Sequence, residues 1–256
     1  MRIVIKVGTS TLAHATGHLN IRRVEELTKV MSDLKNAGHE IIIVSSGAIG
    51  MGVGKLSLPN RPTDIPTKQA AAAVGQCELM YTYDKLFSEY NHTVAQILIT
   101  GEDIESLERR TNFENTIRRL LELGVIPILN ENDTISTDEI EIGDNDTLGA
   151  IVATTAKADL FIILSDIEGL FTSDPRKDKN ATLLHSVQEI TPEIEAMALG
   201  KGSALGTGGM QTKIKAAKIA TAGGSDMVIA NGENPFLIYD IIEGKEVGTR
   251  FYAGEK

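Results

Sequence analysis

The sequence predicts an α/β protein whose mostly parallel sheet carries helices on both faces. Six short apolar runs recur along the 256 residues. Each is nearly continuous rather than alternating, which is typical of strands buried on both faces. Segments with the period of a helix separate most of them, and alternating strands and helices form parallel sheets. The runs span residues 2–7, 40–46, 93–100, 125–130, 160–165 and 227–231.

The connecting segments show where helices begin and end. Asn20 is suited to cap a helix whose apolar residues follow at helical spacing, and Gly38 is suited to end it. A second helix-like segment, residues 70–80, contains the single cysteine, Cys77. One cysteine excludes an internal disulfide, and we expect this thiol to be buried and inert. No linker, low-complexity tract or repeat interrupts the pattern, so we expect a single domain over residues 1–256.

Composition and charge exclude several function classes. The net charge is −10 and no basic run is present, which disfavours nucleic-acid and anionic-membrane binding. No apolar stretch approaches the ~18 residues that span a bilayer. The N-terminus has neither the apolar run nor the cleavage site of a signal peptide. We therefore expect a cytoplasmic protein that binds neither nucleic acid nor membrane.

Polar and glycine-rich tips follow the predicted strands, where open α/β sheets bind ligands. Lys6 stands in an apolar strand, and Gly8 follows it. A lysine there either meets an anion such as phosphate or extends its amino group to water at the strand end. The stretch SSGAIGMGVG (45–54) does not match GxGxxG, and it fits either a close ligand approach or a plain turn.

Two clusters of Asn and Asp, NENDT (130–134) and IGDNDTLGA (142–150), flank a segment that alternates like a hairpin. Asp144 or Asn145 could simply cap the helix that follows. A cap needs one residue, however, whereas GDND supplies three polar ones. Carboxylates and amides together suit an amino acid, with Asp facing its ammonium group and Asn its carboxylate.

The stretch GTGGMQTK (206–213) opens a helix but is not a Walker A loop. Backbone N–H groups at a helix N-terminus favour phosphate. Lys213 lies in the first turn, where the helix dipole disfavours a cation, so we expect an anion nearby. A flexible glycine-rich hinge is the alternative. In SDIEGLFTSDP (165–175), Asp166 could orient a lysine or help to hold a metal, or the segment could be a turn.

The clusters lack the residues of several common chemistries. The five histidines lie outside them, and no GxSxG, Cys–His or HExxH pattern occurs. Lysines, glycines and aspartates without a general base suit phosphoryl transfer, in which positioning and charge neutralisation provide the catalysis. A carboxylate acceptor, with a pKa near 4.3, is already ionised at pH 7 and needs no base.

Together these tips resemble the amino acid kinase family, from Arg2 to about Phe251. The pairing of GDND with GTGGMxTK is highly specific within that family. The matching motifs are KVGTS (6–10), SSGAIGMG (45–52), AAVGQ (72–76), ILNENDT (128–134), GDNDTL (143–148), SDIEGLFTSDP (165–175) and GTGGMQTK (206–213).

The resemblance implies an αβα sandwich with an open, mainly parallel sheet of about eight strands. It implies transfer of the ATP γ-phosphoryl group to the γ-carboxylate of L-glutamate, the first step of proline biosynthesis. Mg²⁺ is expected to bridge the β- and γ-phosphates rather than to have a protein site of its own.

The resemblance also assigns residues to roles. Lys6 and Lys213 are expected to neutralise the transferring phosphoryl group, and Asp166 to hold those lysines. The residues expected to bind ATP are Lys6, Gly8, Ser165, Asp166, Thr207, Gly208, Gly209, Met210, Gln211, Thr212 and Lys213. Those expected to bind glutamate are Ser46, Gly47, Asp133, Asn145 and Asp146.

Many members of the family continue into a C-terminal PUA domain, a type found in RNA-modifying enzymes, and we expect none here. A homo-oligomer, dimer or tetramer, and feedback inhibition by proline are further expectations. Other acceptors known in the family remain alternatives, namely N-acetylglutamate, aspartate, carbamate and UMP. A non-catalytic sensor of glutamate or proline is the alternative from another class, although binding alone has no need of the two lysines.

Overall fold

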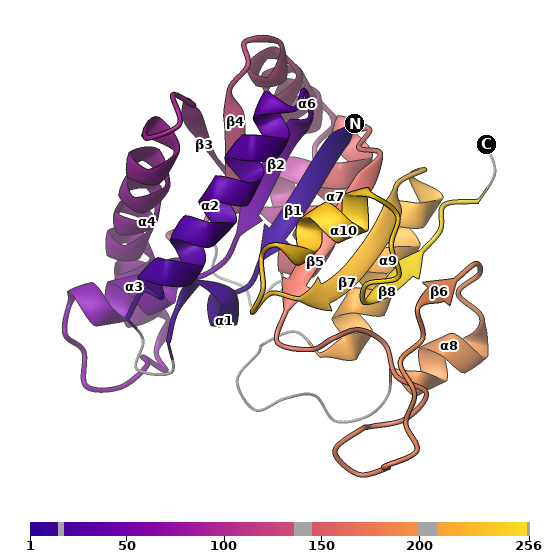
Figure 1. The fold of residues 1–256 in the computed structure, drawn as a ribbon. Coiled ribbons are helices and arrows are strands. Elements are labelled where there is room, and N and C mark those ends of the chain that lie inside the picture. Colours follow the sequence, from indigo (N-terminus) through magenta and orange to yellow (C-terminus); the bar gives the residue numbers. More distant parts are fainter. Residues whose placement is uncertain (15–17, 136–144, 199–208, 255–256) are drawn as a thin grey trace.

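The computed structural model describes residues 1–14, 18–135, 145–198 and 209–254. They form an open sheet of eight strands in the order β3-β4-β2-β1-β5-β7-β8-β6 (Figure 1). All neighbours pair in parallel except β7 and β8, so the predicted mainly parallel sheet is confirmed. The strands are β1 Arg2–Val7, β2 Glu40–Ser45, β3 Val94–Ile99, β4 Ile126–Glu131, β5 Leu160–Ser165, β6 Ser186–Val187, β7 Asp226–Asn231 and β8 Thr249–Phe251.

Helices cover both faces of the sheet, because successive strand residues point to opposite sides and both sides are apolar. Ile3 and Ile5 pack with α2, α4 and α10, whereas Val4 packs with α6, α7 and α9. In Figure 1, α2 and α10 lie in front of the sheet and α7 and α9 behind it. The helices are α1 Thr9–Leu12, α2 Ile21–Asn36, α3 Ala48–Lys55, α4 Ile65–Ser88, α5 Gly101–Glu105, α6 Leu107–Glu122, α7 Asn145–Ala156, α8 Pro192–Met197, α9 Met210–Ala222 and α10 Leu237–Ile242.

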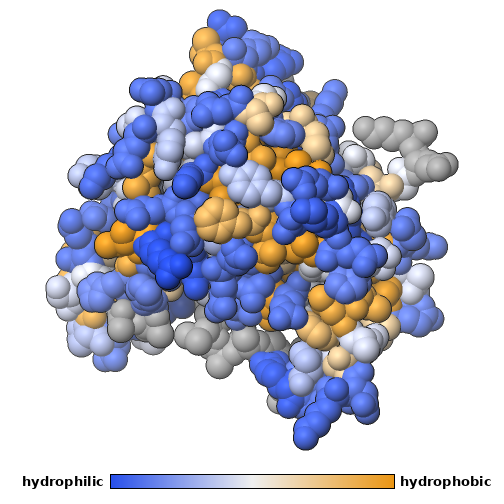
Figure 2. Space-filling view, viewed as in Figure 1, coloured by the Kyte–Doolittle hydropathy of each residue, from blue (hydrophilic) through white to orange (hydrophobic). Residues whose placement is uncertain are grey.

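The face of the molecule that carries α2 and α10 is mainly hydrophilic (Figure 2). Figure 2 shows the face that carries α2 and α10, where apolar residues gather toward the middle and polar residues surround them. Within the described part of the chain, no helix combines the length and the apolar character needed to cross a bilayer.

The helix predicted after Asn20 is confirmed. The side chain of Asn20 accepts a hydrogen bond from the backbone N–H of Arg23 at 3.2 Å, and α2 ends at Asn36. Gly38 follows with φ of +93°, a conformation that glycine adopts at little cost. The six predicted strands are present with ends shifted by one residue at most. β6 and β8, of two and three residues, are too short to give a periodic signal.

The prediction that Cys77 is buried was wrong, because this thiol is exposed. The long helix α4 turns one face to the core through Gln76, Leu79 and Tyr83. Cys77 is one residue beyond Gln76, about 100° further around the helix, and lies on the solvent side.

Candidate active site

The carboxyl ends of four parallel strands meet at one edge of the sheet. β1 lies between β2 and β5, and β4 lies beyond β2. Lys6 in β1 stands opposite Val44 of β2 and Ile163 of β5. The expected gathering of polar strand ends at one edge is therefore confirmed.

The first turn of α7 brings two lysines to one carboxylate. Asp146 is buried, with 1% of its surface exposed. Lys213 Nζ, on α9, donates a hydrogen bond to Asp146 Oδ2 at 2.9 Å. Lys6 Nζ, near the end of β1, lies 2.8 Å from Oδ1. The two atoms form an ion pair, although their geometry is not that of a hydrogen bond. The hydroxyl of Thr212 also donates to Oδ2, at 3.2 Å.

These charges fix the ionisation of Asp146. Burial by itself would raise the pKa of this carboxyl group, but the positive charges of Lys6 and Lys213 outweigh burial and hold the pKa below its usual value. A charged Asp at the N-terminus of α7 is also favoured by the helix dipole. Asp146 is therefore an anion that ties β1, α7 and α9 together. The anion expected near Lys213 is thus present within the protein itself.

A second polar network begins at the neighbouring residue. Asn145 Nδ2 donates to Ser46 Oγ at 2.7 Å and to Asn130 Oδ1 at 3.0 Å. Asn130 Nδ2 in turn donates to Gln76 Oε1 at 3.0 Å. Asn130 and Gln76 are buried, whereas Asn145 and Ser46 are only partly covered. The network thus runs from α4 to the edge where ligands are expected.

Asp133 follows β4, three residues after Asn130 of this network. It is partly buried, and no residue in the described ranges forms a hydrogen bond or ion pair with it. Burial accordingly raises the pKa of its carboxyl group. A carboxylate in this position would gain from the arrival of a cation, and the ammonium group of an amino acid supplies one.

Glycines allow the backbone to turn tightly around these side chains. Gly47, which caps α3, has φ of +104°, a backbone conformation that L side chains rarely adopt. At Gly8, the cap of α1, a Cβ would make only an ordinary contact with Lys6 Nζ, at 3.6 Å, so space alone does not require glycine at this position.

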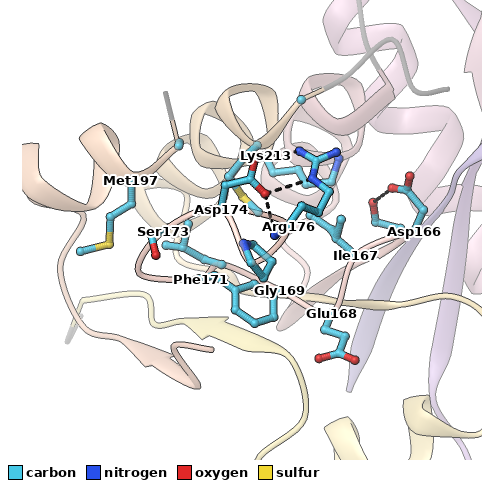
Figure 3. A pocket seen from close by; sticks show the side chains of 16 residues that line it. Asp166, Ile167, Glu168, Gly169, Phe171, Ser173, Asp174, Arg176, Met197 and Lys213 are labelled. Carbon is cyan, nitrogen blue, oxygen red and sulfur yellow. Dashed lines mark hydrogen bonds and ion pairs between the residues drawn. The ribbon is translucent and has the colours of Figure 1, made fainter. Parts of the chain in front are cut away.

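A cavity of about 560 Å³ opens beyond the end of β5 (Figure 3). Ser165, Asp166, Gly209, Met210 and Lys213, all expected to bind ATP, line it together. Ser165 Oγ donates to Asp166 Oδ1 at 3.1 Å. The remaining lining residues are Ile167, Glu168, Gly169, Leu170, Phe171, Ser173, Asp174, Pro175, Arg176, Met197 and Ala198.

The wall of this cavity includes residues to which sequence reasoning gave no role. Figure 3 shows Arg176 joined to Asp174 by an ion pair, at 3.0 Å, and the carboxylate of Asp166 on another side. Phe171 and Met197 add apolar surface. Phe171, Asp174 and Arg176, which had been given no role, lie in or beside the motif of residues 165–175, which was the available signal. Met197 is on α8, far from any motif.

Some expected residues are not tested by this geometry. Thr207 and Gly208 lie outside the described residues. Gln211 is exposed on α9, and Gly209 caps that helix. The expectation that Asp166 holds the lysines stays a prediction. The carboxylate that bridges Lys6 and Lys213 is Asp146, which sequence reasoning had assigned to the substrate.

Sequence reasoning missed the buried part of the second network. Asn130 and Gln76 both occur in motifs that carry the resemblance, but 54 positions separate them and no spacing rule joins them. In the parts of the chain that the structure describes, no group of three or more His, Cys, Asp or Glu side chains could hold a metal ion.

Comparison with known proteins supports the resemblance to the amino acid kinase family. The model of the amino acid kinase family matches residues 1–231. A glutamate 5-kinase of Clostridium perfringens is 55% identical over 98% of this chain and 95% of its own length. One of Carboxydothermus hydrogenoformans is 53% identical over all of this chain and 68% of its own length. A carbamate kinase from Giardia lamblia, bound to AMP-PNP, has the same fold, with a TM-score of 0.70, 19% identity and 98% of each chain covered.

Proposed function

The chain belongs to the amino acid kinase family, and we propose that it transfers the γ-phosphoryl group of ATP to the γ-carboxylate of L-glutamate, giving L-glutamyl 5-phosphate. This reaction begins proline biosynthesis. Support comes from relatives named glutamate 5-kinase at 53–55% identity over 98–100% of the chain. The observation that carries the proposal is the first turn of α7. There Asn145 belongs to the polar network and Asp146 to the lysine pair.

In the proposed reaction an oxygen of the γ-carboxylate attacks the γ-phosphorus, and the bond from that phosphorus to the β,γ-bridging oxygen breaks. The products are the acyl phosphate and ADP. Negative charge shifts toward the bridging oxygen, and fixed cations stabilise that change. Lys6 and Lys213 are the proposed cations, and Asp146 keeps both ammonium groups at the strand ends. No general base is required, since the attacking carboxylate is ionised at neutral pH.

The acceptor is proposed to bind at Ser46, Gly47, Asp133 and Asn145. Asp133 favours a free ammonium group, because it is partly buried without a positive partner among the described residues. N-acetylglutamate has no such group, and UMP would call for cations on this side. Asp146 was expected among these residues, but its contacts with both lysines support a role at the phosphoryl side instead.

ATP is proposed to occupy the cavity beyond β5, with its phosphates toward Lys213 and the N-terminus of α9. Gly209, Met210 and Lys213 already lie on that side of the cavity, and backbone N–H groups at a helix N-terminus favour phosphate. Mg²⁺ would enter with ATP and neutralise part of the phosphate charge.

A hydroxylamine trap tests the reaction and the acceptor together. Purified protein is given Mg-ATP and, in separate reactions, L-glutamate, N-acetylglutamate or aspartate. Hydroxamate from glutamate alone is the expected result. Hydroxamate from N-acetylglutamate would keep the chemistry but overturn the assignment of Asp133, whereas hydroxamate from aspartate would overturn only the identity of the acceptor. Bound ATP without any product would favour a sensor.

The other expectations rest on the resemblance. We propose that the protein is cytoplasmic, forms a dimer or tetramer, and is inhibited by proline. Proline added to the trap assay at fixed glutamate tests the inhibition, and light scattering of the purified protein tests the oligomer.

A further inference from the structure

The network behind Asn145 pairs its amide nitrogen and leaves its amide oxygen without a partner among the described residues. The amide nitrogen of Asn has two hydrogens, and Asn145 donates both, one to Ser46 Oγ and one to Asn130 Oδ1. The carbonyl oxygen of Asn145 is then the atom left to accept a hydrogen bond. No residue in the described ranges donates to it.

Ser46 is left with a hydrogen-bond donor, whereas Asn145 is left with an acceptor. Its hydroxyl oxygen accepts from Asn145, so its own hydrogen is available to donate. An acceptor on Asn145 suits an ammonium group, and a donor on Ser46 suits a carboxylate. This assignment differs from the sequence-based expectation, in which Asn145 faced the carboxylate.

The orientation of Asn145 depends on that of Asn130, which depends on Gln76. Asn130 is 2% exposed and Gln76 is 7% exposed, so water cannot freely replace their contact. Because Gln76 Oε1 accepts from Asn130 Nδ2, the oxygen of Asn130 is turned toward Asn145. Without an acceptor at position 76, the Asn130 amide could rotate and present its nitrogen to Asn145.

The place of Gln76 is itself tightly defined. The preceding residue, Gly75, packs so closely on α3 that a Cβ would lie 1.7 Å from the carbonyl oxygen of Ala48. A Cβ on Gly52 of α3 would lie 1.8 Å from the carbonyl oxygen of Ala71. The two helices therefore touch backbone to backbone, and α4 has little freedom to shift Gln76.

We propose that Gln76 is a positioning residue, which acts through Asn130 to turn the carbonyl oxygen of Asn145 toward the α-ammonium group of the acceptor. This inference rests on the proposed function, since it assumes that the acceptor is an amino acid. Gln76 touches no substrate in this scheme. From its buried position, Gln76 orients Asn130 and thereby favours acceptors that have a free ammonium group.

The test compares L-glutamate with glutarate, which has the same two carboxylates but no ammonium group. Gln76→Met keeps the length of the side chain and removes the acceptor. Loss of one hydrogen bond to a charged group corresponds to about a ten-fold change in affinity. We expect the KM for glutamate to rise about ten-fold, with the KM for ATP within about two-fold of wild type and glutarate turnover unaffected. Parallel changes in both KM values, or unchanged glutamate selectivity, would overturn the proposal.

Two further variants separate positioning from packing. Gln76→Glu retains an acceptor at the same position and is expected to preserve the selectivity for glutamate over glutarate. If Gln76→Met does not fold, loss of selectivity in Gln76→Glu would by itself overturn the proposal. In an Asn130→Ala background, Gln76→Met should have no additional effect on the glutamate KM. Additive effects would mean that Gln76 does not act through Asn130.

Cys77→Ser is the matched control, since Cys77 is adjacent on α4 and exposed. It should behave as wild type in every assay. The wild-type reaction separates the two proposals. Wild-type protein that yields no hydroxamate from glutamate would contradict the proposed function, whereas active wild type with an unaffected Gln76→Met would contradict only the role of Gln76.

Discussion

Asp146 joins two lysines that are distant in the sequence, Lys6 at the end of β1 and Lys213 on α9. All three side chains are largely buried, which makes the carboxylate hard to replace. Removing one partner of a buried ion pair leaves an uncompensated charge, and here it would leave two cations facing each other. In the proposed reaction, the same carboxylate links stability to catalysis.

We predict that Asp146→Asn lowers the free energy of unfolding at pH 7 by about 3 kcal/mol and reduces kcat by about 100-fold or more. Because the folded-state pKa of Asp146 is lowered, its contribution is present at neutral pH and is lost as pH falls through that pKa. The stability difference between variant and wild type should therefore shrink in acid. Urea unfolding at several pH values measures it.

The control for this variant is Asp240→Asn, which removes a surface ion pair with Lys245 and should have little effect. A stability difference for Asp146→Asn that stays constant down to the most acidic pH would contradict the ionisation assigned to Asp146.

The two lysines should act on turnover more than on glutamate binding. We predict that Lys6→Ala and Lys213→Ala each lower kcat by about 100- to 1,000-fold, because fixed charges stabilise the transition state of phosphoryl transfer. The KM for glutamate should change far less. Steady-state kinetics with saturating Mg-ATP measures both quantities. Lys218→Ala, an exposed lysine on the same helix paired with Glu195, is the control. Normal turnover in either active-site variant would refute its role.

Asp133 should make glutamate binding sensitive to pH. Burial raises its pKa, whereas an ammonium partner favours the charged form, so binding of glutamate is coupled to the ionised state of this carboxyl group. We predict that kcat/KM for glutamate falls as pH drops toward this raised pKa, while Asp133→Asn has a much higher KM and lacks that ionisation. Profiles of kcat/KM for both proteins, from pH 5 to 8, test it. Identical profiles would remove Asp133 from the acceptor site.

At the scale of elements, the contact between α3 and α4 positions both the loop after β2 and the buried glutamine. A side chain at Gly75 would overlap backbone atoms of α3, and backbone cannot move aside as the end of a side chain can. Gly50, on α3, has ordinary space, because a Cβ there would lie 3.7 Å from a methyl group of Thr9. Gly75 therefore has no space for a side chain, whereas Gly50 has space for a methyl group, although the sequence alone does not distinguish them.

We predict that Gly75→Ala lowers the free energy of unfolding by about 3 kcal/mol through overpacking. Gly50→Ala, the matched control in the partner helix, should be neutral or gain up to about 1 kcal/mol from helix propensity. Thermal and urea unfolding compare them. Equal effects of the two substitutions would mean that α3 and α4 do not depend on close backbone contact.

These elements show how far the sequence could predict the fold. Patterns local to one segment were sufficient for α2, with its cap at Asn20, and for six strands. The prediction for Cys77 failed because composition marked α4 as apolar without saying which side faces the core. Asp146 was recognised as a site residue, but its pairing with Lys6 and Lys213 was not predicted, since these lysines lie 140 and 67 positions away. Such pairings depend on strand order, which no local pattern contains.

At the scale of the whole molecule, the site has two halves that meet at α7. The proposed acceptor half, with the network of Asn145, lies beyond β2 and β4, and the cavity lies beyond β5. β1 stands between β2 and β5 in the sheet, which places Lys6 between the halves. This arrangement suits direct transfer between two substrates that bind at the same time, since each half has its own residues.

The two halves should therefore respond separately to ligands. A ligand at 100 times its Kd stabilises a folded protein by about 2.7 kcal/mol, so binding is visible as a rise in Tm. We predict that AMP-PNP raises the Tm of Asn145→Ala as much as that of wild type, whereas glutamate raises only that of wild type. Lys213→Ala should show the reverse, with a smaller shift from AMP-PNP and a normal shift from glutamate. Loss of both shifts in either variant would mean that the two halves do not bind their ligands independently, although they lie at different strands of the sheet.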